Sequence, residues 1–246
     1  MPVVLITGGT RGIGKAIAER FAEDGATVVV CGRRPPEDPA FAKQVDVQVC
    51  DVRDREQTQA LVSHVVSTHG GLDVLVNNAG GSPAVDAATV SPRFSEAIVQ
   101  LNLIAPLVLS QQARAAMVTE PDSPACQGVI VNICSVSGTR ASPGTAAYGA
   151  AKAGLLNLTR SLAVEWAPQV RVVAVTPGLV ATEQAADHYP DMAAIAATVP
   201  MGRFGTPADV AHAVAFLASP AAAYVTGASL VIDGGGDWPG FLRPQG

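Results

Sequence analysis

The sequence predicts an α/β fold, a doubly wound parallel sheet of about seven strands with helices on both faces. Short apolar runs alternate with longer segments of helical periodicity, which is typical of parallel strands joined by right-handed crossovers. Of the 246 residues, 48% are hydrophobic and only 15% are charged, which suits strands buried on both faces. Because no repeat or linker interrupts this alternation, we expect a single domain spanning residues 1–246.

The predicted strands are short and rich in valine, isoleucine and leucine, as expected for strands buried on both faces. In the third run, valines alternate with polar residues, so we expect that strand nearer an edge of the sheet. The seven runs are Val3–Ile6, Thr27–Cys31, Val45–Val49, Leu72–Val76, Gly128–Cys134, Val170–Thr176 and Ser229–Ile232.

Two of the intervening helices carry clear start signals. Thr206-Pro207-Ala208-Asp209 supplies a hydroxyl cap, a proline at the first helical position and a carboxylate in the first turn, and this helix should run to about Ala218. Asp54 is expected to cap another helix, which ends at Gly70-Gly71 and whose inner face carries Leu61, Val62, Val65 and Val66. The longest irregular stretch, at about residues 178–205, is expected to form a substrate lid.

Charge and hydropathy exclude several function classes. The formal net charge of −5 argues against a nucleic acid or an anionic membrane as partner. The longest uncharged stretch, Ala97 to Ala113, is interrupted by polar residues and is shorter than the roughly 20 apolar residues of a membrane span, so we predict a buried helix there. No secretory signal precedes the first strand, so we expect a cytoplasmic protein.

The cysteines are expected to be buried, reduced thiols. None forms a C-x-x-C pair, and no histidine lies at metal-ligand spacing from them, so the sequence predicts no metal site. The four are Cys31, Cys50, Cys126 and Cys134.

A glycine-rich turn follows the first strand and precedes a helix. The segment Thr7-Gly8-Gly9-Thr10-Arg11-Gly12-Ile13-Gly14 has the spacing G-x-x-x-G-x-G. Glycine lets the backbone approach a pyrophosphate closely, and the first turn of the helix offers unpaired N–H groups and the positive end of its dipole. The segment therefore predicts a dinucleotide site of Rossmann type, with a tight turn without ligand as the alternative.

The end of the second strand indicates which dinucleotide binds. An acidic residue there binds the ribose of NAD, whereas an arginine accommodates the 2′-phosphate of NADP. The chain has Arg33 and Arg34 at this place, Arg11 adds a charge on the same side, and Glu37 and Asp38 lie close enough to complicate the choice. We expect NADP(H) as the preferred cofactor, with NAD(H) as the alternative. The two arginines could also be a solvated basic strand end that binds no cofactor.

Tyr148 and Lys152 are four residues apart, a spacing that places both side chains on one face of a helix. A free tyrosine has a pKa near 10, and a neighbouring cation lowers it by about 1–3 units, which makes the phenol a usable general acid/base. The alternative is an amphipathic helix with an exposed lysine. At the end of the fifth strand, Ser135 or its rival Ser137 can hold a substrate oxygen beside Tyr148. Asn102, within an apolar helix, is either a structural bracket or a water-holding group.

These residues together resemble the short-chain dehydrogenase/reductase family over nearly the whole chain. The ending, from Arg203-Phe204-Gly205 to Asp233-Gly234-Gly235, looks most like the subgroup that includes 3-oxoacyl-carrier-protein reductases. The motifs that follow in family order are Thr7–Gly14, Asp51-Val52, Asn77-Asn78-Ala79-Gly80, Asn102, Ser135, Tyr148 with Lys152, and Pro177-Gly178 with Thr182.

The resemblance implies a role for each matching residue. Tyr148 would donate or accept the proton, Lys152 would lower its pKa and bind the nicotinamide ribose, and Ser135, favoured over Ser137 by its offset from the tyrosine, would orient the carbonyl. Asn102 would hold a water in a proton relay. The residues that would contact the cofactor are Gly8, Thr10, Arg11, Gly12, Ile13 and Gly14 at the phosphates, Asp51 and Val52 at the adenine, Asn78, Ala79 and Gly80 along the cleft, and Pro177, Gly178, Val180 and Thr182 at the nicotinamide end.

The expected function is hydride transfer between NADP(H) and a carbonyl or secondary alcohol. An NAD-dependent alcohol dehydrogenase and a redox-sensing binder without turnover are the alternatives. Only Arg114 and Arg140 are basic between Phe94 and Ala141, which argues against an acidic carrier protein and for small free substrates. The family resemblance implies a homotetramer or homodimer, and the apolar residues that such an assembly would bury near the C-terminus are Leu230, Ile232, Trp238, Phe241 and Leu242.

The chain departs from the family pattern between Arg33 and Val45. This crossover holds only about a dozen residues, three of them prolines, where the family has a longer helix. We expect a shortened crossover that leaves the adenine side more open.

Overall fold

The computed structural model describes residues 1–183, 185 and 191–236. Its strands form one parallel, seven-stranded sheet in the order β3-β2-β1-β4-β5-β6-β7, which confirms the predicted Rossmann-type fold. The chain winds outward from β1 to β3 and then returns to β4 on the other side of β1, so the topological switch point lies between β1 and β4. The strands are β1 (Val3–Thr7), β2 (Thr27–Gly32), β3 (Asp46–Val49), β4 (Val74–Asn77), β5 (Gly128–Ile133), β6 (Val170–Pro177) and β7 (Ser229–Ile232).

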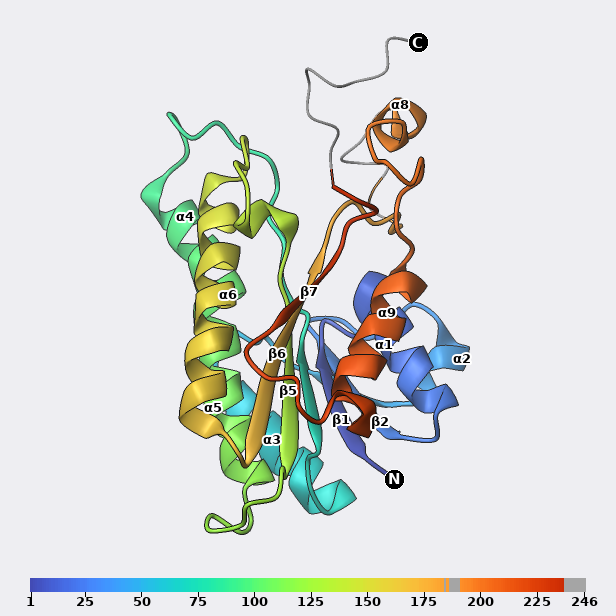
Figure 1. The fold of residues 1–246 in the computed structure, drawn as a ribbon, viewed down its shortest axis with the longest axis vertical. Helices are drawn as coiled ribbons and strands as arrows, with labels where there is room; N and C mark the ends of the chain where they lie inside the picture. Colours follow the sequence, from blue (N-terminus) through green and yellow to red (C-terminus); the bar gives the residue numbers. More distant parts are fainter. Residues whose placement is uncertain (184, 186–190, 237–246) are drawn as a thin grey trace.

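Helices cover both faces of the sheet. Figure 1 shows α3, α5 and α6 on one side and α1, α2 and α9 on the other. The helices are α1 (Gly12–Glu23), α2 (Pro39–Ala42), α3 (Arg55–His69), α4 (Pro92–Val99), α5 (Ala105–Met117), α6 (Ala146–Trp166), α8 (Met192–Ala196) and α9 (Pro207–Ala218). A π-helical turn, η1 (Gln100–Ile104), joins α4 to α5, and short 3-10 turns lie at η2 (Val136–Gly138) and η3 (Pro220–Ala222).

The core consists of two apolar layers, one on each face of the sheet. Successive strand residues alternate between them, as the pleat requires. Leu5 and Val29 pack against α3, α5 and α6, whereas Ile6 and Val30 pack against α1 and α9. The strands β1, β5 and β6 between these layers are buried along their whole length.

The predicted caps are present. Asp54 accepts hydrogen bonds from the backbone N–H groups of Glu56 and Gln57, and α3 ends at Gly70, whose φ is 84°. At α9, Thr206 and Asp209 form a reciprocal capping box. These contacts satisfy donors that have no partner inside a helix, so they fix where both helices begin.

The edge position predicted for the third strand is confirmed, because β3 is the outermost strand beyond β2. The crossover that leads to it is as short as its prolines predict: α2 is a single turn capped by Asp38. Phe41 on this turn is buried and packs into the same apolar layer as the inner face of α1.

Two expectations about burial are wrong. Val66 is exposed and does not belong to the inner face of α3, and Cys126 is exposed in the loop before β5, whereas the other three cysteines are buried. The helical run Pro92–Met117 has the length and hydropathy of a membrane span, but core helices pass this test too, so one such run is weak evidence. Within residues 97–113 only Ala97 and Gln111 are exposed, so the prediction of a helix packed into the protein is confirmed for its inner face. The buried residues of that face include Ile98, Asn102, Ala105, Leu109 and Ala113.

The stretch 178–205 is not wholly irregular, since it contains α8. Val180 and Gly205, near its two ends, pair in an isolated parallel bridge. Leu230 and Val231 are exposed and Ile232 is half-buried on the edge strand β7, so burial of Leu230 and Ile232 by a partner subunit stays a prediction. Trp238, Phe241 and Leu242 lie outside the described residues.

Candidate active site

The glycine loop connects β1 to α1 at the carboxyl edge of the sheet. Gly8 and Gly12 have φ values of 62° and 55°, in the left-handed region that favours glycine. A Cβ atom on Gly14 would lie 2.3 Å from the Gly8 carbonyl oxygen. The chain can therefore turn this tightly only with glycine at these positions.

The first turn of α1 presents its N–H groups next to this loop. The N-cap residue is Arg11, whose side chain has no acceptor for those groups. Helix N-termini favour phosphate because their first N–H groups lack intrahelical partners and the helix dipole is positive there. Ile13 packs into the core beneath the loop, and Thr10 lies against Gly32 at the end of β2. These features fit the pyrophosphate of a dinucleotide.

Asn78 braces the glycine loop from the end of β4. Its Nδ2 atom donates hydrogen bonds to the carbonyl oxygens of Thr7 at 2.9 Å and Gly8 at 3.1 Å. The Thr7 hydroxyl in turn accepts hydrogen bonds from the backbone N–H groups of Asn78 and Ala79, each at 3.0 Å. Asn78 thus acts on the shape of the loop, and Ala79 is held directly beside it.

The segment after β6 approaches the glycine loop from the other side. A Cβ atom on Gly12 would lie 3.7 Å from the Thr182 side chain, so the two residues face each other at short range. A Cβ atom on Gly178 would lie 2.8 Å from Asp233, which leaves no room for a side chain at Gly178. Val180 is fixed by its bridge to Gly205.

On the adenosine side, two arginines extend from the end of β2. Arg33 and Arg34 are both exposed. Asp38, one of the acids that complicated the choice of cofactor, is engaged elsewhere: Lys15 donates a hydrogen bond to it at 2.9 Å, and this contact lowers the pKa of Asp38. Glu37 remains exposed.

Asp51 and Val52 follow β3 at the same edge. Arg53 donates to the Asp51 carboxylate through Nε at 2.9 Å and through Nη2, and this pairing lowers the pKa of Asp51, with a smaller contribution from Arg33. The backbone N–H of Asp51 donates to Gln57 at the start of α3. Val52 is buried and packs into the core, so it positions the turn that carries Asp51.

Tyr148 and Lys152 lie one turn apart near the start of α6. The Lys152 ammonium is 5.6 Å from the centroid of the Tyr148 ring. It is only 3% exposed and donates a hydrogen bond to the carbonyl oxygen of Ile133, the last residue of β5, at 2.7 Å. Burial lowers the pKa of Lys152 to about 8. The lysine therefore points into the protein and stays mostly protonated at pH 7, which excludes the alternative of an exposed lysine.

Ser135 follows β5 directly and caps η2. Its Oγ atom accepts a hydrogen bond from the backbone N–H of Ser137 at 3.2 Å. A hydroxyl that accepts in this way can still donate to a substrate oxygen. The backbone of Ser137 thus orients the Ser135 side chain.

Asn102 lies in the π-turn η1 and is fully buried. Its Oδ1 atom accepts from the backbone N–H of Gly81 at 2.9 Å, and its Nδ2 atom donates to the carbonyl oxygens of Gly81 and Ile98. This arrangement favours the structural bracket among the two roles considered. A Cβ atom on Gly80 would lie 2.6 Å from Asn102 Oδ1 and 3.3 Å from Lys152 Nζ, so the bracket and the lysine meet at Gly80.

A buried polar chain beneath the site was missed by sequence reasoning. Asn77 donates to Ser110 and to Asn132, and Asn132 donates to Thr159, all at 2.9–3.0 Å. This chain links β4, β5, α5 and α6, and Thr159 lies on the helix that carries Lys152. One sequence signal for this chain was Asn132, a polar residue inside the apolar run Gly128–Cys134 that needs hydrogen-bond partners when it is buried.

Two cavities lie beside Ser135 and the start of α6. The larger, of about 280 Å³, is lined by residues that follow β5, β6 and β7. The smaller, of about 120 Å³, lies between the loop 82–90, Phe94 and the first turn of α6. The residues lining the larger cavity are Val136, Thr139, Arg140, Gly178, Leu179, Val199, Asp233 and Gly236.

The fold and the site together define a dinucleotide-binding α/β oxidoreductase. A family model described as "Enoyl-(Acyl carrier protein) reductase" matches residues 8–237. The chain is 37% identical over 243 residues to a 3-oxoacyl-acyl-carrier-protein reductase, FabG, of Thermotoga maritima, covering 95% of this chain and 96% of that protein. The protein belongs to the short-chain dehydrogenase/reductase family.

Solved structures agree with this assignment. An actinorhodin polyketide ketoreductase with NADPH superposes with a TM-score of 0.88 at 35% identity, covering 95% of this chain and 96% of the other. The ligand-free aldohexose dehydrogenase of Thermoplasma acidophilum superposes with a TM-score of 0.87 at 34% identity, covering 95% and 93%. Members of this family bind a nicotinamide cofactor and act on small molecules, and their substrates differ widely, so the family alone does not name the substrate here.

Proposed function

We propose that this protein transfers a hydride between NADP(H) and a small carbonyl compound or secondary alcohol, with Tyr148 as the general acid/base. The observation that carries the proposal is the buried Lys152 ammonium, held by the end of β5 one helical turn from Tyr148. A cation so close to a phenol stabilises the phenolate, because burial weakens screening by water. The two side chains therefore form a proton-transfer pair.

The bound cofactor supplies the hydride, and the chain's own residues handle the substrate oxygen and its proton. In the reductive direction the Ser135 hydroxyl donates a hydrogen bond to the carbonyl oxygen and holds it beside Tyr148. Tyr148 then donates its proton to that oxygen as negative charge develops there, and the Lys152 ammonium stabilises the phenolate that remains. In the oxidative direction the phenolate accepts the alcohol proton.

Tyr148→Phe tests this role, and Tyr224→Phe is its matched control because Tyr224 is fully exposed in the segment between η3 and β7. Turnover of a panel of ketones and alcohols should be lost in Tyr148→Phe and unchanged in Tyr224→Phe. Cofactor affinity, measured by the fluorescence of the reduced nicotinamide, should stay within a few-fold in both. Retained turnover in Tyr148→Phe would refute the mechanism, and loss of cofactor affinity would show that the tyrosine acts on binding.

The preference for NADP(H) is supported by charge. Arg33 and Arg34 are exposed where the 2′-phosphate would lie, and Lys15 holds Asp38 away from that place. Hydrogen bonds to charged groups contribute about 1.5–3 kcal/mol, so replacing either arginine by alanine should weaken NADPH binding by about 10–100-fold and leave NADH binding nearly unchanged. Arg93→Ala, an exposed arginine at the start of α4, is the control. Tighter NADH than NADPH binding by the wild type would instead favour the NAD-dependent alternative.

The remaining parts of the proposal concern the substrate and the assembly. The larger cavity, of about 280 Å³, suits a small free substrate, and its apolar side is formed by Val136, Leu179 and Val199. The apolar surface of Leu230 and Val231 on the edge strand β7 is consistent with a homotetramer or homodimer. Light scattering on the purified protein tests the assembly, since a monomer at micromolar concentration would contradict it.

A further inference from the structure

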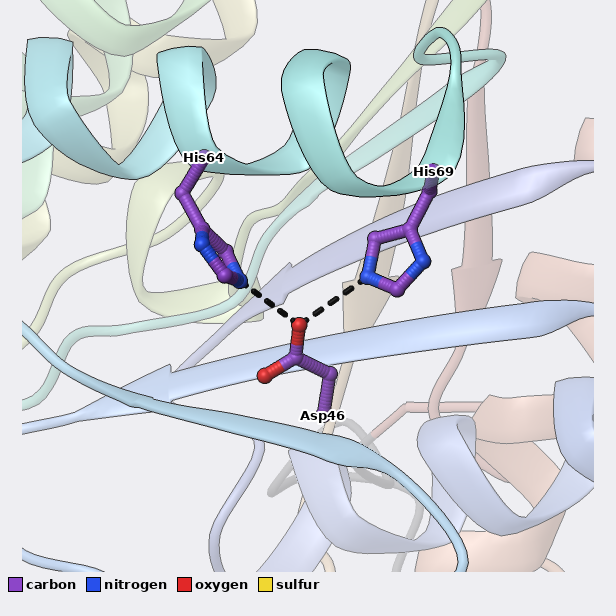
Figure 2. Close-up of side chains that lie close together, drawn as sticks. All are labelled: Asp46, His64 and His69. Carbon is purple, nitrogen blue, oxygen red and sulfur yellow. Dashed lines mark hydrogen bonds and ion pairs between the residues drawn. The ribbon is translucent and has the colours of Figure 1, made fainter.

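Three metal-ligating side chains converge at the outer edge of the sheet, away from the glycine loop. Figure 2 shows His64 and His69 reaching down from α3 to Asp46, the first residue of β3. The Nε2 atoms of both histidines lie close to the same carboxylate oxygen, Asp46 Oδ2, at 2.8 Å and 2.9 Å. Two imidazoles from one helix thus share one oxygen on the strand beneath them.

Asp46 is the shared centre of this cluster. The Gln48 amide nitrogen donates to Asp46 Oδ1 and also lies 3.0 Å from His64 Nε2. If His64 Nε2 carries a hydrogen, it donates that hydrogen to Asp46 Oδ2. If it does not, its lone pair is directed towards the same carboxylate and can bind a metal ion held there.

Thr68 is compatible with the metal-binding state of His64. Its hydroxyl lies 3.4 Å from His64 Nδ1, where it can accept a hydrogen bond from the ring or donate one to it, according to the tautomer. A neutral imidazole with its hydrogen on Nδ1 presents the Nε2 lone pair towards Asp46, which is the form that binds a metal ion. In that form a positive ion can bind His64 Nε2 and Asp46 Oδ2 at the same time.

The surroundings favour a cation with open coordination positions. His69 is the last residue of α3, where the helix dipole is negative and stabilises positive charge. The side chains are partly accessible, with 35% of His64, 19% of His69 and 22% of Asp46 exposed, so water can reach the centre. Gln48 hydrogen-bonds the outer carboxylate oxygen, as groups around metal ligands commonly do.

We propose that Asp46, His64 and His69 bind one divalent transition-metal ion of the zinc class, with water completing the coordination. Two imidazoles and one carboxylate are a donor set that zinc and its neighbours in the series accept. Bonds of about 2.0–2.1 Å at tetrahedral angles place ligand atoms about 3.3 Å apart. Each nitrogen would move about half an ångström away from Asp46 Oδ2, and the three ligand atoms already lie within 4.8 Å of one another. The site lies at the start of β3, whereas the cofactor residues follow the ends of the strands, so it is distinct from the candidate active site.

The experiment uses the full chain after removal of metals by a chelator. Titration with Zn²⁺ in a calorimeter should show one strong equivalent per chain, and titration with Co²⁺ should give the visible absorption of a low-coordinate nitrogen–oxygen site without the sulfur charge-transfer band that the exposed Cys126 would produce. His64→Asn and His69→Asn each remove one ligand atom. Changes to groups around ligands cost about 10–100-fold in metal affinity, so loss of a ligand should cost more than this.

His212→Asn is the matched control, because His212 is an exposed histidine on α9, on the opposite face of the sheet. It should bind Zn²⁺ like the wild type. Circular dichroism and cofactor binding check that the His64 and His69 variants remain folded. The proposal is overturned if the wild type binds no Zn²⁺, or if His64→Asn and His69→Asn bind it as tightly as His212→Asn does.

Discussion

Lys152→Met isolates the consequence of burying an ammonium at the candidate active site. Burial lowers the pKa of Lys152 from its ordinary value of 10.5 to about 8, while the neighbouring Cys134 acts weakly in the other direction. This depression corresponds to about 3 kcal/mol of folding free energy. Between pH 8 and 10.5 the unfolded chain binds more protons at this lysine than the folded chain does, so stability rises with pH through that window and is lowest below it.

The measurement is urea unfolding of the protein without cofactor at pH 7 and at pH 9. The free energy of unfolding of the wild type should gain about 1 kcal/mol on going from pH 7 to pH 9 relative to Lys152→Met, which has no charge to lose. Burial raises the pKa of Cys134 to about 11, but this thiol is present in both proteins and does not affect their difference. Lys43→Met, at an exposed lysine, should follow the wild type. Equal pH dependence in wild type and Lys152→Met would refute the argument.

The other predictions concern the parts that hold the site in shape. Gly14→Ala places a Cβ atom 2.3 Å from a backbone oxygen of the same loop, so cofactor affinity should fall at least about tenfold in a fluorescence titration; unchanged affinity would contradict a tightly closed loop. Asn132→Ala leaves buried partners unsatisfied, including Thr159, and should cost about 1–3 kcal/mol in chemical unfolding, whereas a cost near zero would mean that water replaces the amide. Thr206→Ala removes the cap of α9 and should cost about 1 kcal/mol with turnover unchanged, and a loss of turnover would tie Thr206 to the site.

Local signals in the sequence predicted most of the sheet and its helix boundaries. Strand runs such as Val3–Ile6 are apolar throughout, and capping residues such as Asp54 and Thr206 mark where a helix begins. Both kinds of signal can be recognised without knowing which distant segments come into contact. The glycine loop is of the same kind, since Gly8 and Gly12 adopt conformations that glycine alone reaches easily. Short-range chemistry was therefore enough to predict the fold, and the cofactor cleft that the same motifs indicate stays a prediction.

What sequence reasoning missed depends on contacts between distant segments. Asp46 lies 18 residues before His64 and 23 before His69, and only the reversal of the chain between β3 and α3 brings the three together. The three residues form no short motif in the sequence, so no local spacing indicates that they meet. The apolar character of Val66 predicted burial, but its exposure depends on where neighbouring helices lie.

The π-turn between α4 and α5 fixes how the side chains of α4 are rotated about the helix axis relative to those of α5. A π-turn carries one residue more than an α-helical turn, and one residue corresponds to about 100° of rotation. Deleting one residue from Gln100–Ile104 would rotate α4 about the helix axis relative to α5 and would turn Asn102 away from Gly81. Single-residue gaps should accordingly be tolerated in the loop 119–126 and rejected here, however conservative the remaining side chains.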